Sequence, residues 1–487
     1  APPVIAGDAG SVTATSMILQ EDCGNYCGLI YSLLCSSAGA PSAQKTMSLH
    51  AACLGIIVSC ASAMRVGIVG AGPAGLTLAN ALRSLPGPPI EVCVYDRADA
   101  LRTKVGGGLQ LSCGAAALAE IGIDVRASAQ PLRGVLSRQV GGRDLLELNV
   151  QQAMREASAD YLRGSELPGA AWSTYKATLD SPADSAFAIM RDSLQEILAE
   201  PLPTTTLKLG RVVSGVRESS AGAILSFADG TEEETVDLVV GCDGIGSVVK
   251  EQCFPNMAPS AYSGVKVVFA VAPGGTRPAG SESTFHQWLG DGAYALSATY
   301  GGVGGSTSDM LALCYSDETP GRENDGWDSA EALRSSCMGQ LNEAKMPSEV
   351  LALAERAERF YETSVFFRQP SLSWVSDAGS AVLCGDAAHA MPPFLGQGAN
   401  QAILDAVRLA RELKGVGTKH QTTRAALGAY QRARWLPTAR LLANSRVLGF
   451  LETQRGPGAL FRDAFFFTTG KLGIAKAVFL DGAMMRP

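Results

Sequence analysis

The stretch MRVGIVGAGPAGLTLANALRSLPGPPIEVCVYD, residues 64–96, decides the fold. Arg65–Val69 is a short apolar run that predicts a buried strand, Pro73–Leu85 predicts a helix, and Ile90–Tyr95 predicts a second apolar strand. A strand, a helix and a strand within about 30 residues are typical of a βαβ unit. The sequence therefore predicts an α/β fold from Met64 onward.

The turn between the first strand and the helix has the spacing of a dinucleotide-binding loop. Gly70 permits a tight turn, Gly72 lets a pyrophosphate approach the backbone, and Gly75 lets helix and strand pack closely. The helix that starts with Pro73 and Ala74 directs its free N–H groups and positive end toward the diphosphate.

The second strand ends on an acidic residue, as this motif requires. Asp96 lies 21 residues after Gly75 and is followed by Arg97. An acidic side chain at this position binds a ribose hydroxyl. This unit alone does not distinguish FAD from NAD.

A second segment, about 300 residues downstream, favours FAD. Ala381–Leu383 predicts a strand, CGDAAHAMPP (384–393) presents Asp386 and a stiff proline turn, and FLGQGAN (394–400) opens a helix over Ala399–Leu413. The glycine-rich helix start can hold an anion, such as the N1–C2=O edge of a reduced isoalloxazine.

Three segments together resemble the signatures of the class A, single-component flavoprotein monooxygenases. This is the family of the salicylate- and para-hydroxybenzoate-hydroxylase-like aromatic hydroxylases. The segments are GAGPAG (70–75), VVGCDGIGSVVK (Val239–Lys250) and CGDAAHAMPPFLGQGANQAILDA (384–406). The resemblance covers roughly residues 65–450. It implies a Rossmann-like FAD-binding domain with an inserted antiparallel-sheet substrate domain and C-terminal helices.

The resemblance also implies which residues contact the cofactor. They are Gly70, Gly72, Gly75 and Asp96 at the ADP half, Arg191 at a helix start, Asp243 and Gly244 for both FAD and NAD(P)H, Asp386 at the ribityl chain, and Pro393, Gly396, Gln397, Gly398, Ala399 and Asn400 beside the flavin ring. Two alternatives stay open: Asp243 could cap a turn, and Arg191 could be a surface residue.

The remaining candidate side chains carry weaker signals. His389 follows Asp386 closely, and a packed, hydrogen-bonded structural histidine is favoured over a catalyst. His286, Tyr294 and Tyr300 could line a substrate pocket or be structural. No catalytic side chain is assigned.

The resemblance implies a reaction as well. NAD(P)H would reduce FAD, O₂ would form a flavin C4a-hydroperoxide, and oxygen would pass to a small, aromatic substrate. Only one complete dinucleotide motif is visible, so NAD(P)H would bind transiently. Two alternatives remain: an epoxidase or reductase of an isoprenoid-type substrate on the same fold, and a non-catalytic flavin-binding subunit.

Composition limits the partners. The net charge of −7 and pI near 5.4 argue against nucleic acid. No apolar run reaches the roughly 18 to 20 residues that span a bilayer, and membrane contact by the apolar stretch Phe461–Leu480 is less favoured than core packing. The cysteines lack zinc-site spacing, so we expect no metal.

The pattern along the chain predicts the domains. We expect a discontinuous FAD-binding domain (64–140, 185–250 and 365–430), a substrate domain (141–184 and 251–364) and a C-terminal helical segment (431–487). Thr206–Val216 predicts one strand, and the helix over Arg424–Leu448 should kink or break near Pro437.

Residues 1–63 differ in composition from the rest of the chain. They are rich in Ala, Ser, Gly and Cys, and carry one Lys and no Arg. We interpret them as a leader or disordered extension and expect a cytoplasmic protein. The alternative is an organelle or the secretory pathway, if these residues act as a targeting leader.

Overall fold

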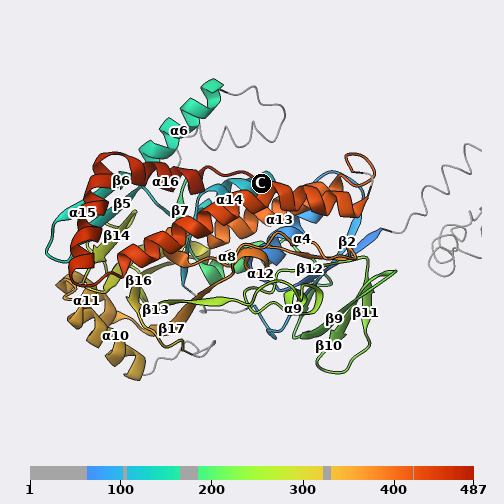
Figure 1. Ribbon diagram of the computed structural model, residues 1–487, viewed down its shortest axis with the longest axis horizontal. Helices are drawn as coiled ribbons and strands as arrows, with labels where there is room; N and C mark the ends of the chain where they lie inside the picture. The colour runs from blue at the N-terminus through green and yellow to red at the C-terminus, as the bar shows by residue number, and fades with distance from the viewer. Residues whose placement is uncertain (1–62, 102–106, 165–184, 322–330, 421) are drawn as a thin grey trace, which may run out of the picture. The chain divides into compact units, whose positions relative to one another are not determined.

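A computed structural model describes residues 63–101, 107–164, 185–321, 331–420 and 422–487. The chain divides into two compact units, Ala1–Ala63 and Met64–Pro487, and the fold described here is that of Met64–Pro487. Its described part contains one parallel sheet, a small antiparallel sheet and a larger mixed sheet, with helices between and over them (Figure 1).

The parallel sheet confirms the predicted βαβ unit. Its strand order is β18-β12-β1-β2-β8, and every neighbouring pair is parallel. The last four residues of β1 are all buried, as expected for a strand covered on both faces. The strands are β1 (Met64–Val69), β2 (Ile90–Asp96), β8 (Leu207–Leu209), β12 (Leu238–Gly241) and β18 (Ala381–Leu383).

Helices and a small sheet cover this parallel sheet. Helix α4 (Pro73–Ser84) packs against β2, α8 (Arg191–Ala199) and α13 (Gly398–Lys414). A β-carbon at Gly67 would lie 3.2 Å from both Leu225 and Val236, so the small sheet packs directly on β1. The small sheet is formed by β9 (Val213–Ser219), β10 (Gly222–Phe227) and β11 (Glu234–Val236).

The larger sheet is mainly antiparallel, as predicted, with parallel pairing of β14 to β5 and of β15 to β7. Its main order is β17-β13-β16-β15-β14-β5-β6, and β3 and β4 join it through β7. The strands are β3 (Gly108–Leu111), β4 (Gln130–Pro131), β5 (Gly134–Gln139), β6 (Asp144–Asn149), β7 (Phe187–Met190), β13 (Ala261–Pro273), β14 (Thr284–Leu289), β15 (Ala293–Gly301), β16 (Thr307–Ser316) and β17 (Arg359–Phe367).

The side chains of this sheet alternate between two environments, because strand residues point to opposite faces in turn. Val268, Leu311 and Leu313 pack in one cluster with buried residues of α10 (Glu331–Glu343) and α11 (Ser348–Arg356). The intervening residues, such as Phe269 and Ala312, face a cavity on the opposite side.

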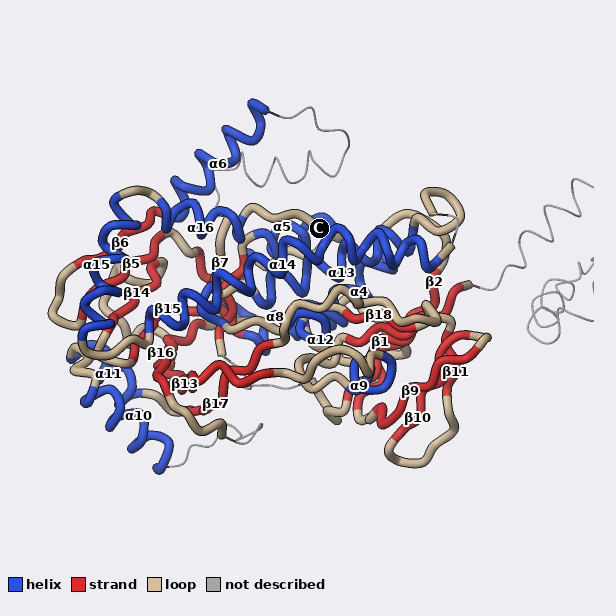
Figure 2. The backbone as a smooth tube through the Cα atoms, in the orientation of Figure 1, coloured by secondary structure: helices blue, strands red, loops and turns tan. Residues whose placement is uncertain are grey.

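The C-terminal helices connect the parallel sheet with the larger sheet. Helix α14 (Thr423–Glu452) contacts α12 (Asp386–His389) and α13 beside the parallel sheet, and continues to α15 (Pro457–Lys471), which packs on β6 (Figures 1 and 2). Helix α16 (Ile474–Ala483) follows. The other helical elements are α5 (Cys113–Glu120), α6 (Val150–Gly164), α9 (Val248–Cys253), η1 (Arg126–Ser128), η2 (Val303–Gly305) and η3 (Pro393–Leu395).

One local prediction was wrong, and the structure narrows a second. The segment Thr206–Val216 is not one strand: Gly210, at φ +72°, turns the chain from β8 in the parallel sheet into β9 in the small sheet. Helix α14 is not broken at Pro437, and the kink that the sequence allowed there stays a prediction. Near the proline, the Thr438 hydroxyl contacts the carbonyls of Arg434 and Trp435.

The predicted domain boundaries stay a prediction. Strand β5, placed by the sequence in the FAD-binding domain, pairs with β14 of the larger sheet.

Among the described residues, no helix combines the length and the apolar character needed to cross a bilayer.

Candidate functional site

A cavity of about 880 Å³ connects the predicted cofactor loops to the larger sheet. Its walls come from the start of α4, the turns after β2, β12 and β18, the loop before α13, and the inner face of the larger sheet. Fifteen predicted cofactor residues line it: Gly70, Gly72, Pro73, Ala74, Asp96, Arg97, Arg191, Asp243, Gly244, Asp386, Pro393, Gly396, Gln397, Gly398 and Ala399.

The three glycines of the first loop have different surroundings. Gly70 adopts φ +105°, and a β-carbon there would lie 2.5 Å from the carbonyl oxygen of Cys242. A β-carbon at Gly75, which does not line the cavity, would clash with the carbonyl oxygen of Gly70. At Gly72, by contrast, no atom lies within 4 Å of the β-carbon position. Gly70 and Gly75 therefore shape the turn, whereas Gly72 leaves room at the cavity wall.

Asp96 holds this loop in place. Its Oδ2 accepts a hydrogen bond from the backbone N–H of Ala71 at 2.7 Å, and its Oδ1 accepts one from Ala98 at 2.8 Å. Gln195 on α8 donates from Nε2 to the Ala71 carbonyl at 2.8 Å. The loop is thus fixed from both sides, and Asp96 keeps its place at the cavity wall.

Two further carboxylates line the cavity after β12 and β18. Asp243 Oδ2 accepts from the N–H of Val248 at 2.7 Å, so it supports the start of α9, while its buried Oδ1 has no hydrogen-bond partner among the described residues. Burial raises the pKa of Asp243. Asp386 lines the cavity with an exposed side chain, and the surrounding protein raises its pKa by desolvation, although His389 and Arg191 oppose the rise.

In the loop before α13 and the first turn of that helix, some residues line the cavity and others only hold the structure together. Asn400, predicted to lie beside the flavin ring, is buried and does not line the cavity. Its Oδ1 accepts from the N–H groups of Ser112 and Gly114 at 2.9 and 3.0 Å, and its Nδ2 donates to the carbonyl of Gln110 at 3.0 Å. Asn400 therefore ties α13 to β3 and α5.

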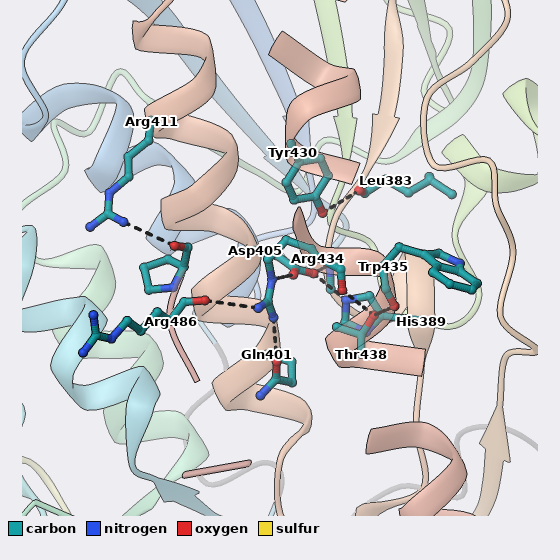
Figure 3. A network of polar contacts seen from close by, with 12 residues as sticks. Leu383, His389, Gln401, Asp405, Arg411, Tyr430, Arg434, Trp435, Thr438 and Arg486 are labelled. Carbon is teal, nitrogen blue, oxygen red and sulfur yellow. Dashed lines mark hydrogen bonds and ion pairs between the residues drawn. The ribbon is translucent and has the colours of Figure 1, made fainter. Parts of the chain in front are cut away.

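A buried polar network joins α12, α13 and α14 through His389, Asp405 and Arg434 (Figure 3). The His389 Nε2 is 2.5 Å from Asp405 Oδ2, and Arg434 Nε donates to Asp405 Oδ1 at 2.7 Å. Asp405 Oδ2 also accepts from the N–H of Gly385 at 3.0 Å. Burial alone would raise the pKa of Asp405, but His389 and Arg434 lower it overall. His389 is thus packed and hydrogen-bonded, as the sequence favoured, and the network holds the turn that presents Asp386.

The inner face of the larger sheet forms the apolar part of the cavity. Tyr294 and Tyr300 line it, together with Phe269 and Leu296. His286 does not line it, because its neighbours Phe285 and Gln287 occupy the inward-facing positions of β14. The helices α15 and α16 complete this part with Phe465, Phe466, Thr469, Ile474, Ala475, Val478 and Phe479.

The residues around the cavity fit FAD. Gly72 leaves open space, and neither α4 nor α13 has a side-chain cap at its N-terminus, so backbone N–H groups there can receive phosphate or flavin oxygens. Among the described residues, Asp243 Oδ1, Gln110 Nε2 and Gln397 Oε1 are buried without hydrogen-bond partners at this wall. No group of described residues could hold a metal ion.

The fold and site define an FAD-binding oxidoreductase, and comparison with known proteins gives the family. The model of the FAD binding domain matches residues 63–445. Aurachin C monooxygenase/isomerase from Stigmatella aurantiaca is 30% identical over 372 residues, covering 75% of this chain and 84% of the relative. The 3-amino-4-hydroxybenzoate 2-monooxygenase of Streptomyces cremeus is 30% identical over 348 residues, covering 71% and 77%.

Solved structures share the fold. HpxO of Klebsiella pneumoniae, complexed with FAD and uric acid, has a TM-score of 0.68 at 17% identity, covering 87% of this chain and 98% of that chain. The 2,6-dihydroxypyridine-3-hydroxylase of Arthrobacter nicotinovorans has a TM-score of 0.63 at 18% identity, covering 81% and 93%. The chain belongs to the class A FAD-dependent monooxygenases, as its three motifs predicted.

Sequence reasoning missed several cavity residues. Gln195 lies four residues after Arg191 on α8, so a helical-face pattern could have indicated it. Gln287 and Glu452 touch each other across 165 residues of sequence and belong to no motif, so no local signal could have found them.

Proposed function

We propose that this enzyme hydroxylates a small aromatic substrate, using NAD(P)H and O₂. The observation that carries the proposal is the continuity of the cavity. Gly72 and Asp386, at the cofactor loops, line the same cavity as Tyr294 and Leu296 on the sheet. An aromatic ring bound against the sheet would therefore share one space with the cofactor. Relatives are named as monooxygenases of 3-amino-4-hydroxybenzoate and 6-hydroxynicotinate, which supports an aromatic substrate.

FAD would be bound in its part of the cavity by residues that the motifs predicted. Gly72 and the N-terminus of α4 would bind the diphosphate, and Asp96 fixes the loop that carries them. Asp243 Oδ1 and the N-terminus of α13 would receive further polar atoms of FAD. We assign Gly75 and Asn400 to shaping this site, because neither lines the cavity.

The reaction balances as substrate–H, NAD(P)H, O₂ and a proton giving substrate–OH, NAD(P)⁺ and water. The chemistry that bound FAD supplies is acceptance of hydride from NAD(P)H and activation of O₂. The protein orients the ring against the sheet, while Phe394 and Leu395 keep water from the loop beside the flavin position. With a single dinucleotide motif in the sequence, NAD(P)H would bind transiently near Asp243 and Gly244.

We further infer that the enzyme works in the cytoplasm on a free small molecule, unless residues 1–63 direct it elsewhere. Expression of fluorescent fusions with and without these residues would test this. A difference in compartment between the two fusions would assign a targeting role to the segment.

The function is tested with purified protein. Flavin released by heating is identified by chromatography, and NADH and NADPH oxidation is followed with 3-amino-4-hydroxybenzoate, 6-hydroxynicotinate and related aromatic acids. We expect FAD to be recovered and at least one compound to accelerate oxidation, with isotopically labelled O₂ entering the product. Recovery of no flavin, or an unlabelled product, would contradict the proposal.

A further inference from the structure

The last residue of α14, Glu452, places a carboxyl group at the cavity wall. The residue is only 2% exposed and lines the cavity. Gln287 Nε2 donates to Glu452 Oε1 at 2.6 Å. Gln287 is held in turn by Ser137, whose hydroxyl donates to Gln287 Oε1 at 2.7 Å. Glu452 Oε2 is buried and makes no hydrogen bond with good geometry among the described residues.

Among the described residues, no Lys or Arg forms an ion pair with the Glu452 carboxyl. Tyr294 faces the carboxyl from β15, and Cys314 lies beside Tyr294. The guanidinium of Arg462 is 2.7 Å from Asp463 Oδ1 and reaches Glu452 only at its backbone oxygen, at 3.3 Å. Burial therefore dominates and raises the pKa of Glu452 to about 8, although Gln287, Tyr294 and Arg462 oppose the rise. At neutral pH the carboxyl is mainly protonated.

The position of Glu452 relates it to the predicted substrate space. Gly449, one turn earlier on α14, faces Phe394, and a β-carbon at Gly449 would overlap the ring of Phe394. Phe394 belongs to the loop beside the flavin position and packs in one cluster with Tyr294 and Cys314. Glu452 therefore lies where the apolar sheet face meets the flavin loop.

We propose that Glu452, oriented by Gln287, forms a subsite that binds a hydroxyl group on the aromatic ring of the substrate. The inference rests on the proposed function and names the side chain that would recognise and orient the substrate. The rest of this wall is mainly apolar, with Phe269, Leu296 and Phe466, although Tyr294, Tyr300 and Thr469 also line it. A hydrogen bond to the Glu452 carboxyl would fix how a ring bound in this mainly apolar space is rotated.

A hydroxyl group suits both protonation states of the carboxyl. The protonated carboxyl has one free O–H, which donates to the oxygen of the ring hydroxyl. The ionised carboxylate accepts the proton of that hydroxyl instead. Either contact would give the buried Oε2 a hydrogen bond of good geometry, which the nearby Tyr294 does not provide.

The test uses the FAD-loaded enzyme and three probes of one shape: 2-naphthol, 2-methoxynaphthalene and 2-methylnaphthalene. Binding is titrated through the change in flavin absorbance. We expect 2-naphthol to bind roughly tenfold or more tightly than 2-methylnaphthalene, because only the hydroxyl can satisfy the buried carboxyl. The methoxy compound, which only accepts, should bind with intermediate strength at neutral pH.

Variants locate the effect at Glu452. Glu452→Leu should bind the three probes with similar affinities, whereas Glu452→Gln, which still hydrogen-bonds, should keep a preference for 2-naphthol. Glu343→Gln is the matched control, because Glu343 is exposed on α10 and does not line the cavity. Its binding profile should equal that of the parent enzyme.

Infrared spectroscopy tests whether Glu452 contacts the hydroxyl of the probe, even if the Glu452→Leu variant does not fold. Infrared difference spectra of the parent enzyme should show a protonated carboxyl band that shifts when 2-naphthol binds and is absent in Glu452→Gln. Equal affinities of the parent enzyme for all three probes, or a band that does not shift, would overturn the subsite. Failure of the proposed function is separate, because it would appear as lost FAD or an unlabelled product in the parent enzyme.

Discussion

The guanidinium of Arg434 lies 2.7 Å from the carboxylate of Asp405, and both side chains are almost completely buried (Figure 3). Removing the carboxylate charge would leave a buried cation without its partner. We expect Asp405→Asn to lower the free energy of unfolding by about 3 to 5 kcal/mol. Urea denaturation at neutral pH measures this loss.

The matched control for this substitution is Asp481→Asn. Asp481 pairs with Arg440 at 2.5 Å, but both side chains of that pair are substantially exposed. Its loss should cost less than about 1 kcal/mol. Because the folded pKa of Asp405 is lowered, its stabilising contribution exists above the unfolded pKa of about 4 and disappears as pH falls through the folded value. Equal losses in the two variants would contradict the buried-pair argument.

Two glycines of the first loop should respond differently to the same substitution. The β-carbon of Gly72→Ala enters open space at the cavity wall, at an extended backbone with φ −80°, so the apoprotein should keep its melting temperature. FAD affinity should fall at least about tenfold, because the methyl group takes the space of the diphosphate. Isothermal titration of apoprotein with FAD measures this.

Gly75→Ala serves as the contrasting variant, since its methyl group would clash with the backbone oxygen of Gly70. It should lower the melting temperature of the apoprotein itself. If both alanine variants bind FAD like the parent enzyme, the loop does not hold the diphosphate.

The buried carboxyl of Glu452 should make stability depend on pH. Its folded pKa of about 8 exceeds its ordinary value of 4.5, so the folded protein binds an extra proton between these values. The stability linked to this proton is fully present below the unfolded pKa and is lost as pH rises toward 8.

Relative to the parent enzyme, Glu452→Gln should therefore become more stable by about 1 kcal/mol for each pH unit between 5.5 and 7.5, and the gain should level off above 8. Urea denaturation at four pH values follows this difference. A difference independent of pH would show that Glu452 is ionised in the folded protein.

The contact between α14 and the flavin loop gives a further prediction. Gly449→Ala places a methyl group within the ring position of Phe394, so the phenyl ring must move toward the cavity or the loop must shift. We expect a changed flavin absorbance spectrum and a loss of roughly 1 to 3 kcal/mol in stability from overpacking. The double variant Gly449→Ala, Phe394→Leu should restore much of the stability, and no restoration would place the strain elsewhere.

The sequence alone determined the βαβ unit, because its glycines, helix start and Asp96 act through local backbone geometry within about 30 residues. It also determined the flavoprotein family, through motifs that are contiguous in the chain. Local patterns did not show that the helix continues through Pro437, or that the Asn400 side chain bonds to Ser112 and Gly114.

Only the tertiary structure decided how the substrate part of the cavity is built. The Glu452 carboxyl enters it where β14 and the end of α14 meet, and the Gln287–Glu452 contact spans 165 residues. A single inward-facing residue in an alternating strand carries no signature of what lies opposite it. The chemistry of that space therefore depends on how distant elements pack, which no stretch of the sequence encodes by itself.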